Sequence, residues 1–153
     1  MNSVDDAVIR ALAIGPDSSP AEHTIDITTT GARTGDPRRI EIWFHRVDGR
    51  WFLTGMPGRR SWYANLRAEP RFVVHLKNGV VADLPATALP VDEPTRRRVI
   101  TQVLDLQTRP DMAARVARRQ RLDEWFEGSP LVEIVFDDEQ LRTARRRSRR
   151  CPT

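Results

Sequence analysis

The chain has 153 residues, 39% of them hydrophobic and 30% charged, so we expect one soluble, globular domain with a core of useful size. The net charge is +4, but the last twelve residues hold six arginines, and without these the charge is −2. A nearly neutral body argues against a nucleic-acid-binding domain, and the absence of a long apolar run argues against a membrane span or a signal peptide.

The end of the chain differs in composition from the rest. We predict a single domain over residues 1–141 and a flexible, arginine-rich tail over residues 142–153. The tail contains no aromatic residue between its arginines, so a solvated end is favoured over contact with nucleic acid or an anionic membrane. Cys151 is the sole cysteine, which excludes an internal disulfide and a cysteine-based metal site and favours the cytoplasm.

The first third of the chain predicts a short helix followed by strands. Residues 3–14 have the spacing of an amphipathic helix, and a connector rich in Gly, Pro and Ser follows. Alternating apolar residues then predict strands over residues 23–30 and 39–47. The pair Asp48–Gly49 is a strong hairpin signal, so residues 50–54 should form the returning strand.

The middle of the chain predicts one helix and a second hairpin. The helix covers residues 61–69, with Ser61 as its N-cap. Two strands follow over residues 71–77 and 80–89, and Pro85 places the later part of the second strand at an edge or a bulge.

Helical signals dominate the last third before one closing strand. Asp92 caps a predicted helix over residues 93–107, a further helical segment begins after Pro110 and ends at Gly128, and residues 131–136 form a strand. Five or six mainly antiparallel strands in a chain of this size favour a small barrel with helices packed outside, which is a mainly β, α+β fold.

The segment TTTGARTGDPRR, residues 28–39, lies between two β-branched runs and must turn the chain. Its two glycines permit positive φ and leave backbone N–H groups uncovered. Arg33, Arg38 and Arg39 add planar donors that suit phosphate or carboxylate. The segment fits a hairpin loop with solvated arginines as well as it fits an anion-binding loop, and its glycine spacing is not that of a P-loop.

A second glycine- and arginine-containing segment is TGMPGRRSWYANL, residues 54–66, where a strand ends and a helix begins. The first N–H groups of a helix have no internal partners and carry the positive end of its dipole, and Arg59 and Arg60 lie at that end. Such a place binds phosphate, carboxylate or an electron-rich ring edge. In the alternative interpretation Trp62 anchors the core, Asn65 is a buried structural amide and both arginines are solvated.

The histidines offer weaker signals. His23, His45 and His75 are too far apart in the sequence to form a metal motif by spacing alone. His75 alternates within an apolar strand, so we expect a half-buried strand residue rather than a catalyst.

The two segments resemble the deazaflavin-dependent nitroreductase family, part of a wider flavin and deazaflavin oxidoreductase group with an FMN-binding-like split β-barrel. ITTTGARTGDPRR is close to the family pattern TTxGRxSGxPR, and SWYANLRAEPR is close to WYxNLxANPxV. The order and spacing of the strands agree over residues 24–89. Two departures accompany the match: Ala32 stands where the family often has arginine, and the stretch over residues 54–62 is shorter than usual.

The resemblance implies an enzyme that holds the deazaflavin coenzyme F420 and passes a hydride from its reduced ring to a planar acceptor such as a quinone or a nitro compound. No covalent nucleophile is required, and Tyr63 is a candidate proton donor. The first segment would grip the phosphate and acidic tail, and the second would line the ring. The cofactor-binding residues implied in this way are Arg33, Thr34, Gly35, Pro37, Arg38, Arg39, Gly55, Met56, Arg59, Arg60, Trp62 and Asn65.

Three other functions stay open at this point. The same barrel suits an FMN enzyme or a carrier that binds a cofactor or lipid without turnover, and a nucleic-acid-binding barrel that uses the basic tail is less favoured. The expected partners are a small-molecule acceptor and a second copy in a homodimer, with no nucleic acid. The expected location is the cytoplasm, with peripheral membrane association as the alternative.

Overall fold

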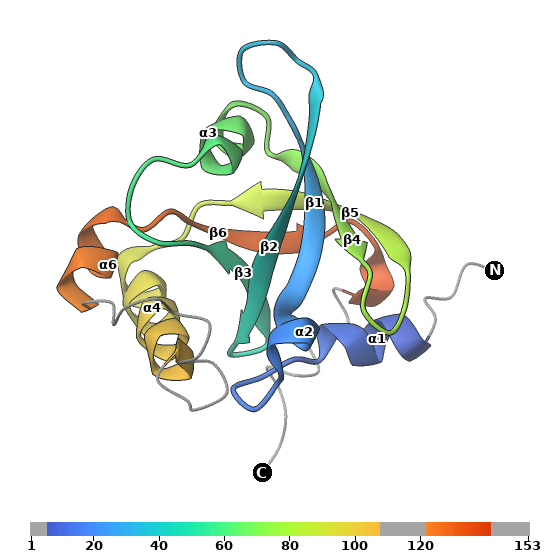
Figure 1. The fold of residues 1–153 in the computed structure, drawn as a ribbon, viewed down its shortest axis with the longest axis horizontal. Helices are drawn as coiled ribbons and strands as arrows, with labels where there is room; N and C mark the ends of the chain where they lie inside the picture. The colour runs from blue at the N-terminus through green and yellow to red at the C-terminus, as the bar shows by residue number, and fades with distance from the viewer. Residues whose placement is uncertain (1–5, 108–121, 142–153) are drawn as a thin grey trace.

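The computed structural model describes residues 6–107 and 122–141, and Figure 1 shows their arrangement. The elements in chain order are α1 (Asp6–Leu12), α2 (Pro20–His23), β1 (Thr24–Thr30), β2 (Pro37–Val47), β3 (Arg50–Thr54), α3 (Ser61–Ala68), β4 (Arg71–Leu76), β5 (Ala82–Leu89), α4 (Glu93–Gln107), α6 (Leu122–Gly128) and β6 (Leu131–Phe136). The start of the first predicted helix, most of the segment predicted after Pro110 and the basic tail lie outside the described residues.

Six antiparallel strands close into a barrel in the order β1-β2-β3-β6-β5-β4, which confirms the predicted α+β barrel with outer helices. Alternate residues of each strand point inward, and the apolar ones fill the barrel. The most buried of them include Ile25, Ile27, Phe44, Leu53, Val74 and Ile134. In Figure 1, α3 lies beside the β1–β2 hairpin at one end of the barrel, and α1 and α2 lie at the other end.

A second apolar cluster joins the barrel to α4 and α6. Its buried members are Val47, Phe52, Val99, Ile100, Val103, Leu104, Trp125 and Leu131. The predicted cap of α4 is confirmed, because the Asp92 carboxylate accepts a hydrogen bond from the Thr95 N–H at 3.0 Å. Through this apolar cluster, α4 and α6 pack directly against β2, β3 and β6.

Both predicted hairpins are present, with one correction. Asp48 and Gly49 have φ angles of 55° and 74°, as a two-residue hairpin turn requires. The sequence predicted that the part of β5 after Pro85 would lie at an edge, but the part before it has the unpaired side. The β5–β6 ladder covers Ala86 to Leu89, so Pro85 lies in the earlier part of β5, whose ladder is with β4. A residue without an N–H group fits there because one side of that part has no ladder.

His75 is a strand residue, as predicted, but it is more buried than half, with 8% of its surface exposed. Its Nε2 lies 2.7 Å from the Thr28 hydroxyl oxygen, and its Nδ1 lies 2.7 Å from a carboxylate oxygen of Asp83. The imidazole therefore links β1, β4 and β5 across the outer face of the barrel.

The first hairpin differs from the sequence prediction in where its second strand begins. β1 ends at Thr30, as predicted, but β2 begins at Pro37 rather than Arg39, so residues 31–36 alone form the turn. Arg38 and Arg39 lie within β2, opposite Thr29 and Thr28. Pairing with β1 overrode the turn signal of the proline, which is tolerated as the first residue of a strand.

Two helix starts also differ from the prediction. The connector predicted before β1 ends in α2, a single turn whose Ser19 and Glu22 form a reciprocal capping box. In α3, Ser61 is the first helical residue and not the N-cap. Arg60 occupies the N-cap with an extended backbone, and no side chain caps the helix.

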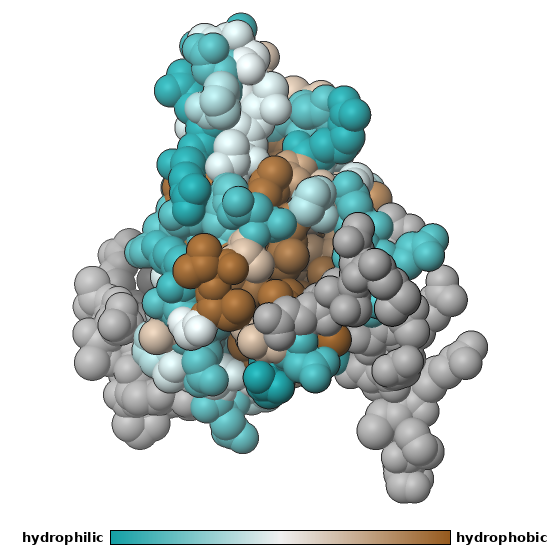
Figure 2. All heavy atoms as spheres, turned by 90° about the vertical axis from the view of Figure 1, so that its right-hand side faces the viewer, coloured by the Kyte–Doolittle hydropathy of each residue, from teal (hydrophilic) through white to brown (hydrophobic). Residues whose placement is uncertain are grey.

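Few large apolar side chains of the described residues are exposed, and these are Ile40, Met56, Val81 and Leu89. Figure 2 shows apolar surface gathered in the middle of one face, with polar surface around it. Within residues 6–107 and 122–141, no helix has both the length and the apolar character needed to cross a membrane.

Candidate functional site

Asn65 brings the two segments selected from the sequence into contact. Its side chain is 7% exposed and projects from α3 toward the first hairpin. The amide oxygen accepts a hydrogen bond from the Ala32 N–H at 2.9 Å, and the amide nitrogen donates to the Thr29 hydroxyl at 3.1 Å. The geometry supports the interpretation of Asn65 as a structural amide that holds the first hairpin against α3.

Replacing Asn65 by alanine is expected to lower the free energy of unfolding by roughly 1–2 kcal/mol, because two largely buried hydrogen bonds are lost. Asn78 is the matched control, since its side chain also makes two hydrogen bonds, in its case to two backbone carbonyls, but is exposed. Asn78→Ala should cost about half as much or less. Urea unfolding of both variants measures the two losses of unfolding free energy. Equal losses would contradict the structural role of the Asn65 amide.

The turn over residues 31–36 depends on both of its glycines. The Gly31 N–H donates to the Asp36 carbonyl at 2.8 Å, and the Gly35 N–H donates to the Gly31 carbonyl at 2.9 Å. Gly35 has a φ of 76°, which L-residues rarely adopt. A Cβ on Gly31 would lie 3.0 Å from the Thr34 hydroxyl oxygen and 3.1 Å from the Asp36 carbonyl oxygen, so a larger residue would open the turn.

The start of α3 faces this turn and is electrostatically positive. Its first turn contains no acidic residue, and no side chain caps its first N–H groups. Such groups carry the positive end of the helix dipole and attract anions. Arg60 at the N-cap directs its guanidinium back along the chain, donating to the Arg59 carbonyl at 3.0 Å.

A cavity of about 730 Å³ lies between the turn and the start of α3, and we call it the arginine cavity. Its lining residues are Thr29, Gly31, Ala32, Arg33, Thr34, Arg38, Ile40, Arg59, Arg60, Ser61, Trp62, Ala64 and Asn65. Four arginines line it and no lining residue is acidic. The arrangement can hold an anionic group at the helix start, and Ile40 and Trp62 add apolar wall.

Seven of the twelve predicted cofactor residues line the arginine cavity: Arg33, Thr34, Arg38, Arg59, Arg60, Trp62 and Asn65. The prediction did not include Thr29, Gly31, Ala32, Ile40, Ser61 and Ala64. Of these, Ile40 could have been predicted from the sequence, because it follows Arg38 by two residues and so shares its face of β2. Ala32 and Ala64 present no side-chain chemistry that would have selected them.

The other predicted residues lie elsewhere or at the margin. Gly35 and Pro37 line a groove of about 470 Å³ that they share with Arg71 of β4. Gly55 lies next to the arginine cavity, since a Cβ there would be 3.9 Å from Arg60 Nε. Met56 is 46% exposed and is not among the lining residues.

Arg39 lies on the face of β2 opposite Arg38 because strand residues alternate. Its Nε donates to the Asp26 carboxylate at 2.9 Å, and Lys77 binds the same carboxylate at 2.7 Å. The hydrogen bond from Lys77, followed by that from Arg39, lowers the pKa of Asp26. Arg39 is therefore engaged in an ion-pair network on the outer face and does not line the arginine cavity.

Tyr63, the candidate proton donor, is half-buried against the core and does not line the arginine cavity. Its ring packs edge-on against Trp62 at 5.9 Å between centroids, and the Arg67 guanidinium lies 5.8 Å from its centre. Trp62 itself is 7% exposed, so it anchors the core as well as closing the cavity. The structure favours a packing role for both aromatic rings.

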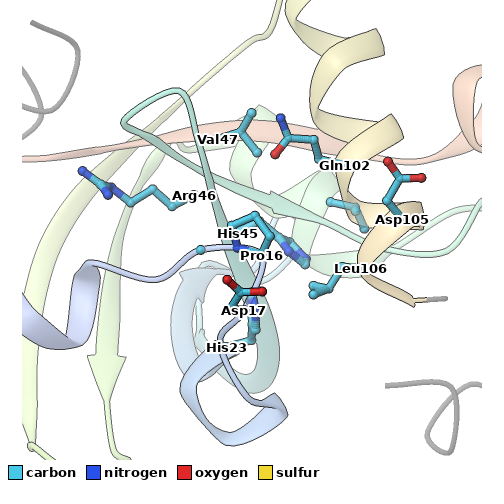
Figure 3. Close-up of a pocket in the computed structure, with 11 residues that line it drawn as sticks. Pro16, Asp17, His23, His45, Arg46, Val47, Gln102, Asp105 and Leu106 are labelled. Atoms are coloured by element: carbon cyan, nitrogen blue, oxygen red, sulfur yellow. The ribbon is translucent and has the colours of Figure 1, made fainter. Parts of the chain in front are cut away.

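A second cavity, of about 490 Å³, lies at the opposite end of the barrel between α2, β2 and α4 (Figure 3). We call it the histidine cavity because His23 and His45 line it, together with the carboxylates Asp17 and Asp105. Burial, with a smaller effect from His23, lowers the pKa of His45 to about 3, so its imidazole is neutral near pH 7. The described residues hold no group of three or more His, Cys, Asp or Glu arranged for a metal ion. Its two carboxylates outnumber its one arginine, Arg46, so this cavity is the poorer candidate for an anion.

The family model described as F420H(2)-dependent quinone reductase matches residues 14–120 of the chain. The matched range contains both segments that form the arginine cavity and all strands except β6.

Solved structures resemble the whole barrel at low sequence identity. A protein from Bacteroides thetaiotaomicron, provisionally described as a 5-nitroimidazole antibiotic resistance protein, is 10% identical with a TM-score of 0.59, covering 89% of this chain and 83% of its own. A conserved hypothetical protein from Mycobacterium tuberculosis is 18% identical with a TM-score of 0.57, covering 90% and 82%. A Listeria innocua protein provisionally described as a pyridoxamine 5′-phosphate oxidase is 12% identical with a TM-score of 0.57, covering 87% and 93%. These likenesses show the split β-barrel fold.

Proposed function

The chain belongs to the F420H(2)-dependent quinone reductase family, and from that premise we propose that it is an F420-dependent oxidoreductase that reduces a planar acceptor such as a quinone or a nitro compound. One observation of the structure carries the proposal most directly. The arginine cavity combines four arginines with an uncapped helix start and has no acidic lining residue. A cavity of this kind suits the phosphate and carboxylates of the F420 tail.

In this proposal each part of the cavity has a binding role. Arg33 and Arg38 hold the acidic tail, and the N–H groups at the start of α3 bind a phosphate or the anionic edge of the reduced ring. Arg59 and Arg60 add positive charge at that edge, and Ile40 supplies apolar contact. F420, when bound in its reduced form, supplies the hydride. The chain itself binds, orients and excludes water, so it needs no covalent nucleophile.

The proposal is tested by titrating the protein with F420 and FMN and by following oxidation of reduced F420 in the presence of menadione. We expect saturable F420 binding, and oxidation that requires both protein and menadione. Tight FMN binding without F420 binding would replace this proposal with an FMN enzyme. F420 binding without oxidation would indicate a carrier, and binding of neither would refute a cofactor function.

The remaining expectations from the sequence stay proposals. They are a single domain over residues 1–141, a homodimer, a cytoplasmic location and a small-molecule acceptor. Light scattering checks the oligomeric state. Salt-dependent DNA or RNA binding that is lost on deletion of residues 142–153 would instead favour the nucleic-acid alternative.

A further inference from the structure

The turn between β3 and α3, residues 55–60, contacts the end of α6, which is about seventy residues away in the sequence. The Gly58 N–H donates a hydrogen bond to the Gly128 carbonyl at 3.1 Å. Gly58 has a φ of 120° and precedes the N-cap of α3 by two residues. The contact therefore lies next in the chain to Arg59 and Arg60, which line the arginine cavity.

Gly128 permits this approach because it has no side chain. A Cβ at this position would lie 3.2 Å from Pro57 Cβ, with the Pro57 Cα at 3.8 Å and the Gly58 nitrogen at 3.9 Å. The last two distances are ordinary van der Waals contacts, but the contact with Pro57 Cβ is tight, and the proline ring is rigid. A methyl group at Gly128 would therefore shift Pro57, and with it the turn, away from α6. The absence of a side chain at Gly128 allows the turn to lie this close to α6.

Arg96 of α4 fixes the end of α6 on which the turn rests. Its Nε and Nη2 both donate to the Phe126 carbonyl at 3.1 Å, and Nη2 also donates to the Ser129 carbonyl at 2.7 Å. A guanidinium at a helix C-terminus satisfies carbonyls that have no helical partner and compensates the negative end of the dipole. The Thr54 hydroxyl donates to the Pro130 carbonyl at 2.6 Å, so the end of β3 is tied to the same segment.

We propose that Gly128 and Arg96 are positioning residues for the arginine cavity. Through the Gly128–Gly58 hydrogen bond and the contact with Pro57, they set where Arg59, Arg60 and the first N–H groups of α3 lie. The ligand that they serve is an anion. The identification of this anion as F420 rests on the proposed function. The positioning role itself does not depend on which anion binds.

The direct test compares Gly128→Ala with Gly15→Ala. Gly15 is the matched control because a Cβ there would have no atom within 4 Å. Hydrogen exchange of the Gly58 amide, measured without ligand, should become at least about tenfold faster in Gly128→Ala and stay unchanged in Gly15→Ala. The Kd for F420 should rise about tenfold in Gly128→Ala alone. Unchanged exchange and unchanged Kd in Gly128→Ala would overturn the inference.

A second pair of variants keeps the test valid if Gly128→Ala fails to fold. Arg96→Met removes the charge and the forked donors and should reproduce both changes, whereas Arg96→Lys keeps a cation and should restore part of the affinity. If Arg96→Met matches the wild-type protein in both measurements, the inference fails.

Pyrophosphate separates this inference from the proposed function. If the wild-type protein binds pyrophosphate and not F420, the proposed function fails, and weaker pyrophosphate binding by Gly128→Ala still supports the positioning role. If it binds neither anion, both proposals for the cavity fail.

Discussion

Replacing Arg33 and Arg38 together by alanine is expected to weaken F420 binding at least about a hundredfold. Both side chains line the arginine cavity on the side of the hairpin, and neither is among the ion pairs found within the described residues. Each charge-assisted hydrogen bond to an anionic ligand contributes about 1.5–3 kcal/mol, which corresponds to tenfold or more in affinity. Fluorescence titration of F420 measures the change.

Arg39→Ala is the control that the structure provides for this experiment. It removes a positive charge from the same strand, one residue from Arg38, but on the opposite face and from an ion pair with Asp26. We expect its F420 affinity to stay within about threefold of the wild-type value, with the residual effect decreasing in salt. Equal losses for Arg38→Ala and Arg39→Ala would mean that overall charge, and not the cavity, binds the coenzyme.

Lowering the pH from 6.5 to 4.5 is expected to destabilise the protein by roughly 2–3 kcal/mol through His45. The folded state holds the pKa of His45 at about 3, compared with 6.5 for an unperturbed histidine, because the ring is buried and lies beside His23. Between these two values the unfolded chain binds a proton at His45 and the folded chain does not. Stability therefore rises with pH across this window and is lost as the pH falls.

His45→Gln should remove most of this pH dependence, whatever its effect on stability at pH 7. The readout is the slope of unfolding free energy against pH, obtained from urea unfolding at several pH values. The pKa of Asp26 is also lowered, so its contribution is lost only at still lower pH, below the chosen window. An unchanged slope in His45→Gln would contradict the assignment.

The barrel could be predicted from the sequence because its signals are local and periodic. Alternation identified β1 and β2, and the Asp48–Gly49 pair identified the turn after them. The residues at which strands begin and end were harder to predict from the sequence. Pairing with β1 extended β2 from Arg39 back to Pro37, which places Arg38 and Arg39 in one strand with their side chains on opposite faces. The prediction therefore grouped Arg39 with a cavity that it does not line.

The family resemblance implied that the two glycine- and arginine-containing segments bind one coenzyme together, but it did not show what joins them. Asn65 joins them through Ala32 and Thr29, and the sequence offered this residue either as a ligand or as a structural amide. The contact of Gly128 with Gly58 has no sequence signal, since it depends on how α6 docks onto the barrel. Local residue patterns carry no information on contacts of this kind between segments that are far apart in the sequence.

A crystal structure of the protein with F420 tests the central claim most directly. We predict that the coenzyme occupies the arginine cavity, with its phosphate or carboxylates within hydrogen-bond distance of the N–H groups at the start of α3 and of at least one guanidinium among Arg33, Arg38, Arg59 and Arg60. F420 bound in the histidine cavity, or in the groove beside Arg71, would contradict the account.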